Sequence, residues 1–477
     1  MVFSSAIFLF LFLPLVLFSH WLVGRCFRNI LLLFASLFFY AWGEGLYVVV
    51  MLLSILVNYI FARMLDANIW QQRRKLLVTI MLVINLLPLL YFKYSVFLLT
   101  NINAILSVNK QLNVPDEVHL PIGISFFTFQ AMSYLIDVYR KTNKAQQSIF
   151  SIGLYIALFP QLIAGPIVRY HDVAEQIKKR SQGLTLFASG VERFVFGLGK
   201  KMLIANPLGF VADSIFSLPA NELTVLTAWL GIVCYALQIY FDFSGYSDMA
   251  IGLGRMFGFR FFENFNFPYI ANSIRGFWQR WHISLSNWFR DYLYIPLGGN
   301  RKGSLITARN LFIVFLVCGL WHGASWNFII WGLLHGTFLV LERGFWGGVL
   351  QRLPKIVQHS YVLLIVLTTW VFFRGETLDI SVNYLSAMYS FADAWALHKK
   401  IAIQLDIEFY VTFIMALLLS TPIYQRLETG IKEKLLTQQL SSILYMLGSI
   451  LLLSAIFILV IMEIAIGAYN PFIYFRF

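Results

Sequence analysis

Long apolar stretches succeed one another along almost the whole chain, separated by polar or charged segments. Each is long enough, or nearly so, for a helix to cross a hydrocarbon core of about 30 Å. The stretches cover residues 6–24, 29–42, 46–65, 76–99, 120–137, 149–167, 223–241, 305–320, 327–341, 361–373, 408–424 and 442–466. The pattern therefore predicts an all-α, polytopic integral membrane protein with roughly 11–13 transmembrane helices.

Some of these stretches are interrupted by helix-breaking residues. Pro121 and Gly123 lie inside one of them, and Pro160, Gly165 and Pro166 lie inside the next. Non-helical backbone at membrane depth is tolerated only where it faces protein or a water-filled cavity. We therefore expect re-entrant segments beside the spanning helices. Because no repeat, long linker or soluble-like stretch interrupts the series, residues 1–477 are expected to form a single membrane domain.

The composition agrees with a chain that dissolves in lipid. Of its 477 residues, 59% are hydrophobic and 12% are charged, whereas a soluble domain carries roughly 25% charged residues. The net charge of +13 would suit nucleic acid in a soluble protein, but here Lys and Arg alternate with membrane spans. The lipid bilayer is therefore the predicted partner, and nucleic acid is not. Three widely spaced cysteines, with no HExxH, GxSxG or P-loop sequence, predict no metal site, no serine hydrolase of that type and no NTPase.

The segment 255–309 differs from the rest because it is too basic to cross lipid and is rich in tryptophan. Within it, apolar and polar side chains recur at helical spacing on two neighbouring faces. The apolar face holds Phe277, Trp281, Leu285 and Trp288, and the polar face holds Arg275, Gln279, His282 and Ser286. Such a helix is typical of the membrane interface, where it can serve as a simple surface anchor. The positive charge also suits an anionic ligand such as the phosphates of coenzyme A.

A second unusual feature is His322, which lies inside otherwise membrane-grade sequence. An ionisable side chain there costs free energy and needs a partner or a function. Neutral imidazole is a good general base near pH 7, and Gly319 and Gly323 let a backbone or a substrate come close. The residue types alone leave two interpretations open, a catalytic histidine and a hydrogen-bonded structural one. His335, also inside a span, is interpreted as a satisfied packing residue.

Two carboxylates, Asp242 and Asp248, lie at the end of another apolar stretch. Carboxylates beside a span are costly unless they are paired. Arg255 or another member of the basic segment is the expected partner. The pattern favours a structural role for these carboxylates over a catalytic one.

Taken together, these runs resemble the motifs of the membrane-bound O-acyltransferase family. Residues 276–286 (GFWQRWHISLS) and 288–300 (WFRDYLYIPLGGN) resemble its core motif, and residues 319–323 (GLWHG) resemble its second motif. The segments 242–248 and 158–166 (LFPQLIAGP) also look like the family, so that the likeness covers most of the chain. Within the family, the chain is most similar to bacterial members that O-acetylate alginate, peptidoglycan or other secreted polysaccharides.

The resemblance implies a central tunnel, with His322 as the catalytic histidine inside it and His282 as a second catalytic position on its cytoplasmic side. It also implies donor-binding or tunnel-lining candidates, which are Arg280, Trp281, Trp321 and Asp242. The donor would be a cytoplasmic thioester, either acetyl-coenzyme A or an acyl carrier protein, with no bound cofactor. The acetyl group would cross the bacterial inner membrane to a periplasmic partner with a hydrolase-like fold, which completes transfer to the polysaccharide.

The chain ends in the short aromatic segment 470–477 (NPFIYFRF), just after the last apolar stretch. This ending resembles the tail of a small accessory peptide in the related D-alanyl teichoic-acid system, in which a tail tyrosine can carry the acyl group. The resemblance therefore implies Tyr474 as an acyl relay. An aromatic anchor at the membrane interface is the alternative interpretation.

Three other functions share parts of this pattern. A transporter or flippase without chemistry would also have broken spans and polar residues at mid-membrane depth. A transferase of the same family could carry D-alanine or a fatty acyl chain, and a scaffold in a secretion assembly would need no catalytic histidine. The paired histidine motifs favour the transferase, and the fused tail favours acetyl as the transferred group.

Overall fold

A computed structural model describes residues 1–67, 72–107, 110–116, 118–163, 165–390, 396–435, 439–467, 469–471 and 473. Every regular element in these residues is a helix, which confirms the all-α prediction. The chain forms two compact units: unit 1 comprises Met1–Val191, Ala250–Phe262 and Arg290–Leu293, and unit 2 comprises Glu192–Met249, Glu263–Phe289 and Tyr294–Phe477. Helices α10 (Leu184–Gly199) and α12 (Val225–Met256) contribute residues to both units.

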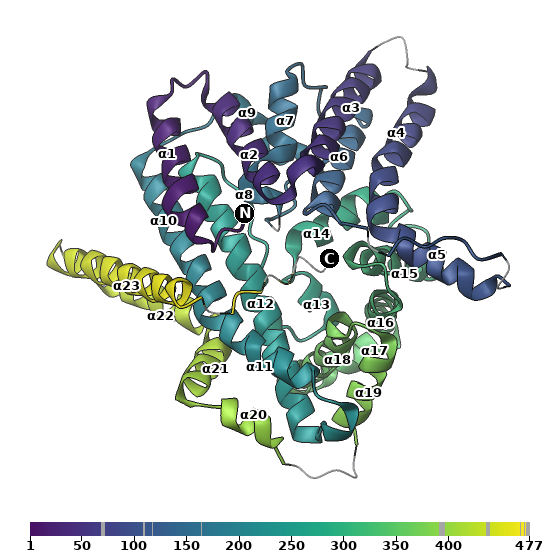
Figure 1. The fold of residues 1–477 in the computed structure, drawn as a ribbon, viewed down its shortest axis with the longest axis vertical. Coiled ribbons are helices and arrows are strands. Elements are labelled where there is room, and N and C mark those ends of the chain that lie inside the picture. Colours follow the sequence, from purple (N-terminus) through teal and green to yellow (C-terminus); the bar gives the residue numbers. More distant parts are fainter. Residues whose placement is uncertain are drawn as a thin grey trace. The chain divides into compact units, whose positions relative to one another are not determined.

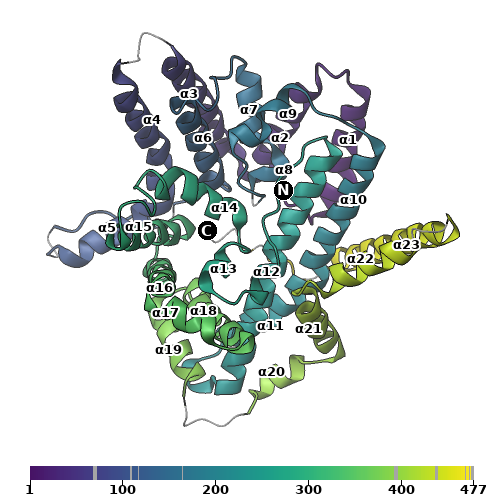
Figure 2. The ribbon, with the colours of Figure 1, turned by 180° about the vertical axis from the view of Figure 1, so that it is seen from behind.

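Unit 1 is built mainly from the N-terminal helices. Its elements are η1 (Phe8–Phe12), α1 (Leu13–Leu22), α2 (Arg28–Glu44), η2 (Gly45–Tyr47), α3 (Val48–Asp66), α4 (Arg74–Leu89), η4 (Leu90–Tyr94), α5 (Ser95–Ile105), α6 (Ile124–Tyr139), α7 (Ile149–Ala157), α8 (Phe159–Leu162), α9 (Tyr170–Lys178) and most of η9 (Arg290–Tyr294). Figures 1 and 2 show α2, α3, α6 and α7 side by side. Gly153 allows α7 to pack closely, because a Cβ there would lie 3.2 Å from Leu33 and 3.6 Å from Ile55.

Unit 2 contains the two histidine motifs and the C-terminal helices. Its elements are η6 (Lys200–Ala205), α11 (Asn206–Phe216), η7 (Ala220–Glu222), η8 (Pro268–Ile270), α13 (Ile274–Trp278), α14 (Ile283–Phe289), α15 (Ser304–His322), α16 (Trp326–Arg343), α17 (Phe345–Arg352), α18 (Lys355–Arg374), α19 (Leu378–Met388), α20 (Lys399–Gln404), α21 (Ile407–Leu419), α22 (Ile423–Leu435) and α23 (Gln439–Ala465). Helices α15 and α16 form a close antiparallel pair, in which Gly319 lies against Phe328 and Gly332 lies against Phe315. Small residues at such positions let two backbones approach.

By length and hydropathy, the described part of the chain contains fewer candidate spans than the pattern predicts. Among the described residues, seven are long and apolar enough, or up to nine if each of two bent helix pairs is one span. The seven are Arg28–Asp66, Arg74–Ile105, Leu184–Phe216, Val225–Met256, Ser304–His322, Lys355–Arg374 and Ile443–Ala465. The bent pairs are α16 with α17, at 74°, and α21 with Ile423–Gly430 of α22, at 71°. By this criterion the described residues hold seven to nine candidate spans, where the pattern predicts roughly 11–13.

Three causes account for the difference. The predicted span 6–24 becomes the shorter apolar helix Phe8–Leu22. The predicted spans 29–42 and 46–65 run into each other through the short η2 turn and form one helical segment. The predicted spans 120–137 and 149–167 become the 16-residue helix α6 and the 9-residue helix α7, and the latter ends before Pro160. The break near Pro160 and the bent pairs agree with the interrupted segments that the prolines and glycines predict.

One apolar helical segment, Leu184–Phe216, is missing from the predicted spans because charged residues interrupt it. These residues are Glu192, Arg193, Lys200 and Lys201. In unit 2 the basic ones are paired with carboxylates of α12: Arg193 and Lys200 with Asp248, and Lys201 with Asp242, each at 2.7 Å. A charge that is paired inside the protein does not prevent a helix from lying at membrane depth.

Candidate active site

The core motif in unit 2 is broken into two short helices. Helix α13 ends at Trp278, residues 279–282 form a turn, and α14 begins at Ile283. His282 takes a left-handed backbone conformation with φ of 45°, which ends the regular helical geometry at that residue. The turn is fastened to a neighbouring segment, because the carbonyl oxygen of Asn264 accepts the N–H of Ile283 at 2.9 Å.

The prediction of one amphipathic helix in the membrane interface is therefore wrong. The residues of the predicted apolar face are all buried within the protein, namely Phe277, Trp281, Leu285 and Trp288. They pack against other aromatic side chains: the Trp281 ring centroid lies 5.0 Å from that of Trp370 and 5.1 Å from that of Phe265. Helical spacing identifies a buried face but does not reveal whether protein or lipid covers it.

Hydrogen bonds determine the tautomer of His282, whose side chain is fully buried. Its Nδ1 lies 3.3 Å from Asn264 Oδ1, and the same oxygen accepts the Ser284 N–H at 3.1 Å. Because a main-chain N–H can only donate, this Asn264 atom must be the amide oxygen, so that Nδ1 of His282 carries the proton. Burial lowers the pKa of His282 to about 3, and the ring is therefore neutral near pH 7. Its Nε2 is a lone-pair acceptor with no hydrogen-bond partner among the described residues.

His322 is the last residue of α15 and is 2% exposed. Its imidazole is enclosed by aromatic rings, with centroid distances of 4.9 Å to Trp321, 5.0 Å to Phe373 and 5.1 Å to Trp331. All three contacts are edge-to-face, the arrangement that aromatic pairs prefer. This packing surrounds the imidazole with aromatic side chains.

The indole of Trp321 contacts both histidines of the motifs. Its centroid lies 4.9 Å from that of His322 and 6.0 Å from that of His282. Phe243 of α12 contacts His282 edge-to-face at 4.7 Å. The structure thus brings His282, Trp321 and His322 together in one buried aromatic cluster, as candidate residues of a common site should be.

Two further candidates, Arg280 and Trp281, lie in the same turn as His282. Trp281 stacks on Phe277, with centroids 5.6 Å apart, and so belongs to the aromatic wall of unit 2. Arg280 is half-buried, and its Nη1 donates to the carbonyl oxygen of Asn266 at 3.0 Å. The N–H of Asn266 donates in turn to the carbonyl oxygen of Arg280 at 2.9 Å. Arg280 therefore fastens the turn beside His282.

His335 is the satisfied packing residue that the sequence predicts. The Trp278 indole N–H donates to its Nδ1 at 3.3 Å, and its Nε2 lies 3.1 Å from the Thr369 hydroxyl oxygen. The Thr369 hydroxyl donates to the carbonyl oxygen of Val366 at 3.0 Å, which completes a chain of donors and acceptors. Both nitrogens of His335 are thereby used within the fold.

Asp242 pairs with a different residue from the one expected. Its Oδ1 lies 2.7 Å from Lys201 Nζ, so that the partner comes from η6 and not from Arg255 or the basic segment. The carboxylate also contacts the end of the chain, because its Oδ2 accepts the N–H of Ile473 at 3.2 Å. Lys201 Nζ donates to the carbonyl oxygen of Pro471. Tyr474 lies outside the described residues.

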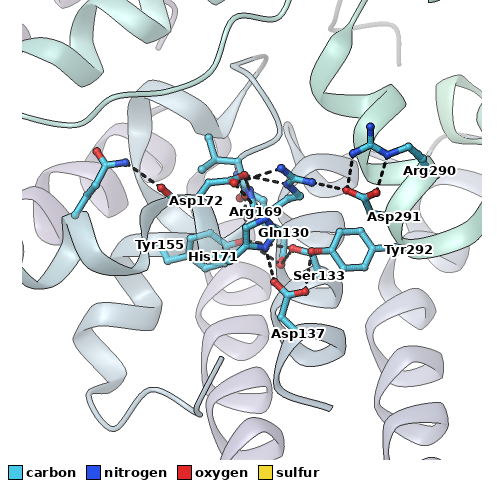
Figure 3. Close-up of polar contacts among 12 residues, drawn as sticks. Gln130, Ser133, Asp137, Tyr155, Arg169, His171, Asp172, Arg290, Asp291 and Tyr292 are labelled. Atoms are coloured by element: carbon cyan, nitrogen blue, oxygen red, sulfur yellow. Dashed lines mark hydrogen bonds and ion pairs between the residues drawn. The ribbon is translucent and has the colours of Figure 1, made fainter. Parts of the chain in front are cut away.

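Unit 1 contains a second polar cluster, which no sequence motif predicts (Figure 3). Nδ1 of His171 lies 2.9 Å from Asp137 Oδ2, and its Nε2 lies 3.1 Å from Asp172 Oδ1. Hydrogen bonds to Asp137 and Asp172 raise the pKa of His171 to about 9, so that the imidazole is protonated near pH 7.

The same cluster anchors residues 290–293 of the core motif within unit 1. Arg169 Nη1 donates to Asp291 Oδ2 at 2.6 Å, and the Tyr292 hydroxyl donates to Asp137 Oδ1 at 2.9 Å (Figure 3). Arg290 also binds the Asp291 carboxylate, at 2.7 Å. The sequence signal was the concentration of Arg and Asp in this part of the motif, but no spacing rule connects it to Asp137.

A cleft of about 520 Å³ opens in unit 2 beside α13. Among the residues that line it are Arg275, Arg343, Glu342, Tyr294 and Gln351. Two guanidinium groups in one cleft can bind the phosphates of a thioester donor. The cleft is not lined by His282 or His322, so it is a candidate for holding a donor and not for the chemistry itself.

Comparisons with known proteins agree with the motifs. A model of the membrane-bound O-acyltransferase family matches residues 34–373. The chain is 45% identical over 421 residues to the probable alginate O-acetylase AlgI of Azotobacter vinelandii, covering 87% of this chain and 83% of that protein. It is 41% identical to the probable alginate O-acetylase AlgI of Pseudomonas putida over the full length of both. It is also 38% identical to the peptidoglycan O-acetyltransferase of Helicobacter pylori, covering 81% of this chain and 80% of that protein.

Proposed function

Since the chain belongs to the membrane-bound O-acyltransferase family and is therefore a membrane O-acyltransferase, we propose that it supplies acetyl groups for O-acetylation of an alginate-like polysaccharide. The observation that carries this proposal is the similarity to the alginate O-acetylases, which extends over the whole chain at 41% identity. The buried cluster of His282, Trp321 and His322 supports it, because it supplies an imidazole in a buried site lined by aromatic rings. The bacterial origin of these relatives supports the inner membrane as its location.

His322 is proposed as the general base. In acyl transfer from a thioester, the acceptor oxygen attacks the carbonyl carbon, a C–O bond forms, and the C–S bond breaks. The imidazole takes the proton of the attacking hydroxyl and returns it to the departing sulfur. The aromatic rings around His322 exclude water, which would otherwise hydrolyse the thioester.

His282 and the residues next to it are proposed to orient the donor. The Nε2 lone pair of His282 can accept one hydrogen bond from the donor or shuttle a proton, while Nδ1 stays bound to Asn264. Trp321, which contacts both histidines, would separate donor from acceptor in a tunnel between the two membrane faces. Trp281 would form part of the wall, and Arg280 would attract the donor's negative charge.

The donor is proposed to be acetyl-coenzyme A or an acyl carrier thioester from the cytoplasm, with the phosphates bound by Arg275 and Arg343. No resident cofactor is needed, because the thioester is already activated. The Tyr474 hydroxyl is proposed to receive the acetyl group and present it to a periplasmic hydrolase-like partner, which passes it to the polysaccharide.

The test is the acetyl content of the secreted polysaccharide in cells that carry His322→Ala. Loss of a general base lowers the rate by about 10²–10⁴-fold, so acetylation should become undetectable while the protein reaches the membrane in normal amounts. His359→Ala is the matched control, because His359 is a half-buried histidine of unit 2 whose Nδ1 lies 3.2 Å from the carbonyl oxygen of Ala271. Unchanged acetylation in the His322 variant would rule out the catalytic assignment. Release of alanine in place of acetate from the wild-type product would change the cargo to D-alanine.

A further inference from the structure

The ion pair between Lys201 and Asp242 is almost completely removed from solvent. Their side chains are 3% and 2% exposed, and Nζ lies 2.7 Å from Oδ1. Lys201 lies in η6 and Asp242 lies in α12, so the pair joins two elements of unit 2. Burying two charges carries a large desolvation penalty, which is offset only when the remaining donors and acceptors also find partners.

One further donor and one further acceptor of this pair bind the backbone near the end of the chain. Asp242 Oδ2 accepts the N–H of Ile473 at 3.2 Å, and Lys201 Nζ donates to the carbonyl oxygen of Pro471. The acid and the base therefore bind an N–H and a C=O that lie two residues apart. Main-chain groups left without hydrogen-bond partners in such a buried place would cost free energy. The ion pair and the segment therefore satisfy each other's hydrogen-bonding groups.

Two side-chain contacts continue this docking toward α23. Asn206 Nδ2 donates to Asn470 Oδ1 at 3.3 Å, and the Tyr469 hydroxyl donates to Asp213, which also pairs with Arg374 at 2.6 Å. Ile473 is itself 8% exposed, whereas Tyr469 and Asn470 are exposed and Pro471 is half-buried. The segment thus reaches the ion pair at residue 471, where Lys201 binds it.

We propose that the Lys201–Asp242 pair is a docking site for the chain's own C-terminal segment and that it positions residue 474 for acyl transfer. The second part rests on the proposed function, because it assumes that Tyr474 receives the acetyl group. Lys201 and Asp242 are positioning residues in this account. Since they hold main-chain atoms on both sides of residue 472, they fix the register of the segment directly before Tyr474.

The experiment measures how fast a cysteine at position 473 reacts with a maleimide in the full-length protein. Ile473→Cys is introduced together with Cys26→Ser, because Cys26 is exposed whereas Cys234 and Cys318 are buried. The main-chain N–H that Asp242 accepts is retained in this variant. Labelling should be slow while the segment is docked, and at least about tenfold faster when docking is lost, because reaction then no longer requires local opening.

Two double variants of the ion pair separate docking from a merely structural role. Lys201→Met with Asp242→Leu removes both charges without leaving one unpaired, a replacement that folded proteins often tolerate. Lys201→Asp with Asp242→Lys keeps an ion pair, but the new lysine cannot accept the Ile473 N–H and the new aspartate cannot donate to Pro471. Both variants should label quickly. Lys200→Met is the matched control and should label slowly, because Lys200 pairs with Asp248 and Asp248 retains Arg193.

Slow labelling in the apolar double variant, or in the reversed pair, would overturn the proposal. If neither double variant accumulates in the membrane, a disulfide test of docking replaces them. Asn206→Cys and Asn470→Cys are then introduced, again with Cys26→Ser, into the chain that keeps the native ion pair. Formation of the disulfide would support docking, and its absence would refute it. The acyl relay is judged separately: if Tyr474→Phe is added to the Ile473→Cys chain, slow labelling together with full acetylation would rule out the relay and leave the docking site standing.

Discussion

Replacement of Gly319 by alanine should disable the protein by forcing apart one pair of helices. A Cβ at Gly319 would lie 2.2 Å from the carbonyl oxygen of Phe328 and 3.1 Å from its carbonyl carbon. Carbon and oxygen stay about 3.3–3.6 Å apart even in close C–H···O contacts. The obstacle is main chain of α16 and cannot rotate away, so α15 and α16 must separate by roughly 1 Å.

The expected loss of activity is much larger than the expected loss of stability. Overpacking of this kind costs about 1–3 kcal/mol, which leaves most of a protein with a stability of about 5–15 kcal/mol folded. His322 ends the same helix three residues later and must move with it. Misplacement of a reacting group by about 1 Å can lower a rate about 10²-fold. Acetylation should therefore fall roughly a hundredfold in membranes that contain nearly normal amounts of the variant.

The assay compares acetate released from the polysaccharide with the amount of variant recovered from the membrane by gel filtration. Gly336→Ala is the matched control on the partner helix, because a Cβ there would meet Phe315 and Phe312 at 3.3–3.4 Å, which a shift of a few tenths of an ångström relieves. It should keep most of its activity. Wild-type acetylation by Gly319→Ala would refute the idea that the α15–α16 contact sets the position of His322.

His171 and His282 should affect the pH dependence of thermal stability in opposite directions. The pKa of His171 is about 9 in the folded protein and about 6.5 when unfolded, so its ion pairs stabilise fully below about pH 6.5 and are lost as the pH rises to about 9. His171→Gln should flatten the fall in melting temperature over that range, and an unchanged slope would contradict the pairing. The pKa of His282 is lowered to about 3, because the folded protein buries the imidazole in its neutral form. The contribution of this burial to the stability of the folded protein is therefore fully present above about pH 6.5 and is lost as the pH falls toward 3. His282→Gln should remove this acid-side loss, and an equally steep fall in the variant would assign it to other groups.

The hydrophobic pattern predicts a spanning helix best where apolar residues run without interruption. The predicted stretches 305–320 and 442–466 correspond to α15 and α23 with ends that differ by a few residues. The pattern does not show what covers an apolar face, which is why it predicts an interfacial helix around Trp281 although this segment is buried in protein. It also does not show how long a helix continues, since α6 has the composition of a span but only 16 residues.

Sequence reasoning could identify the histidines of the site but not their surroundings. His322 stands out because an ionisable residue in an apolar run needs an explanation. Asn264, which fixes the tautomer of His282, lies 18 residues before it, and no periodicity connects the two. The left-handed backbone of His282 is equally unpredictable, because histidine adopts it only where the surrounding structure requires it.

The partner of Asp242 could have been inferred from depth along the membrane normal. A carboxylate within an apolar helix needs a cation at a similar depth, and Lys201 lies inside the apolar segment Leu184–Phe216 whereas Arg255 lies at the end of its helix. The hydrophobic pattern counts Lys201 and Asp242 as two separate unfavourable charges, so that it predicts no spanning helix over the segment 184–216. In the folded chain they form one ion pair, and removal of one partner would leave the other buried at a cost of about 3–5 kcal/mol. A charge that interrupts an apolar run is therefore better taken as evidence for a partner than as evidence against a helix, and here that partner also binds the end of the chain.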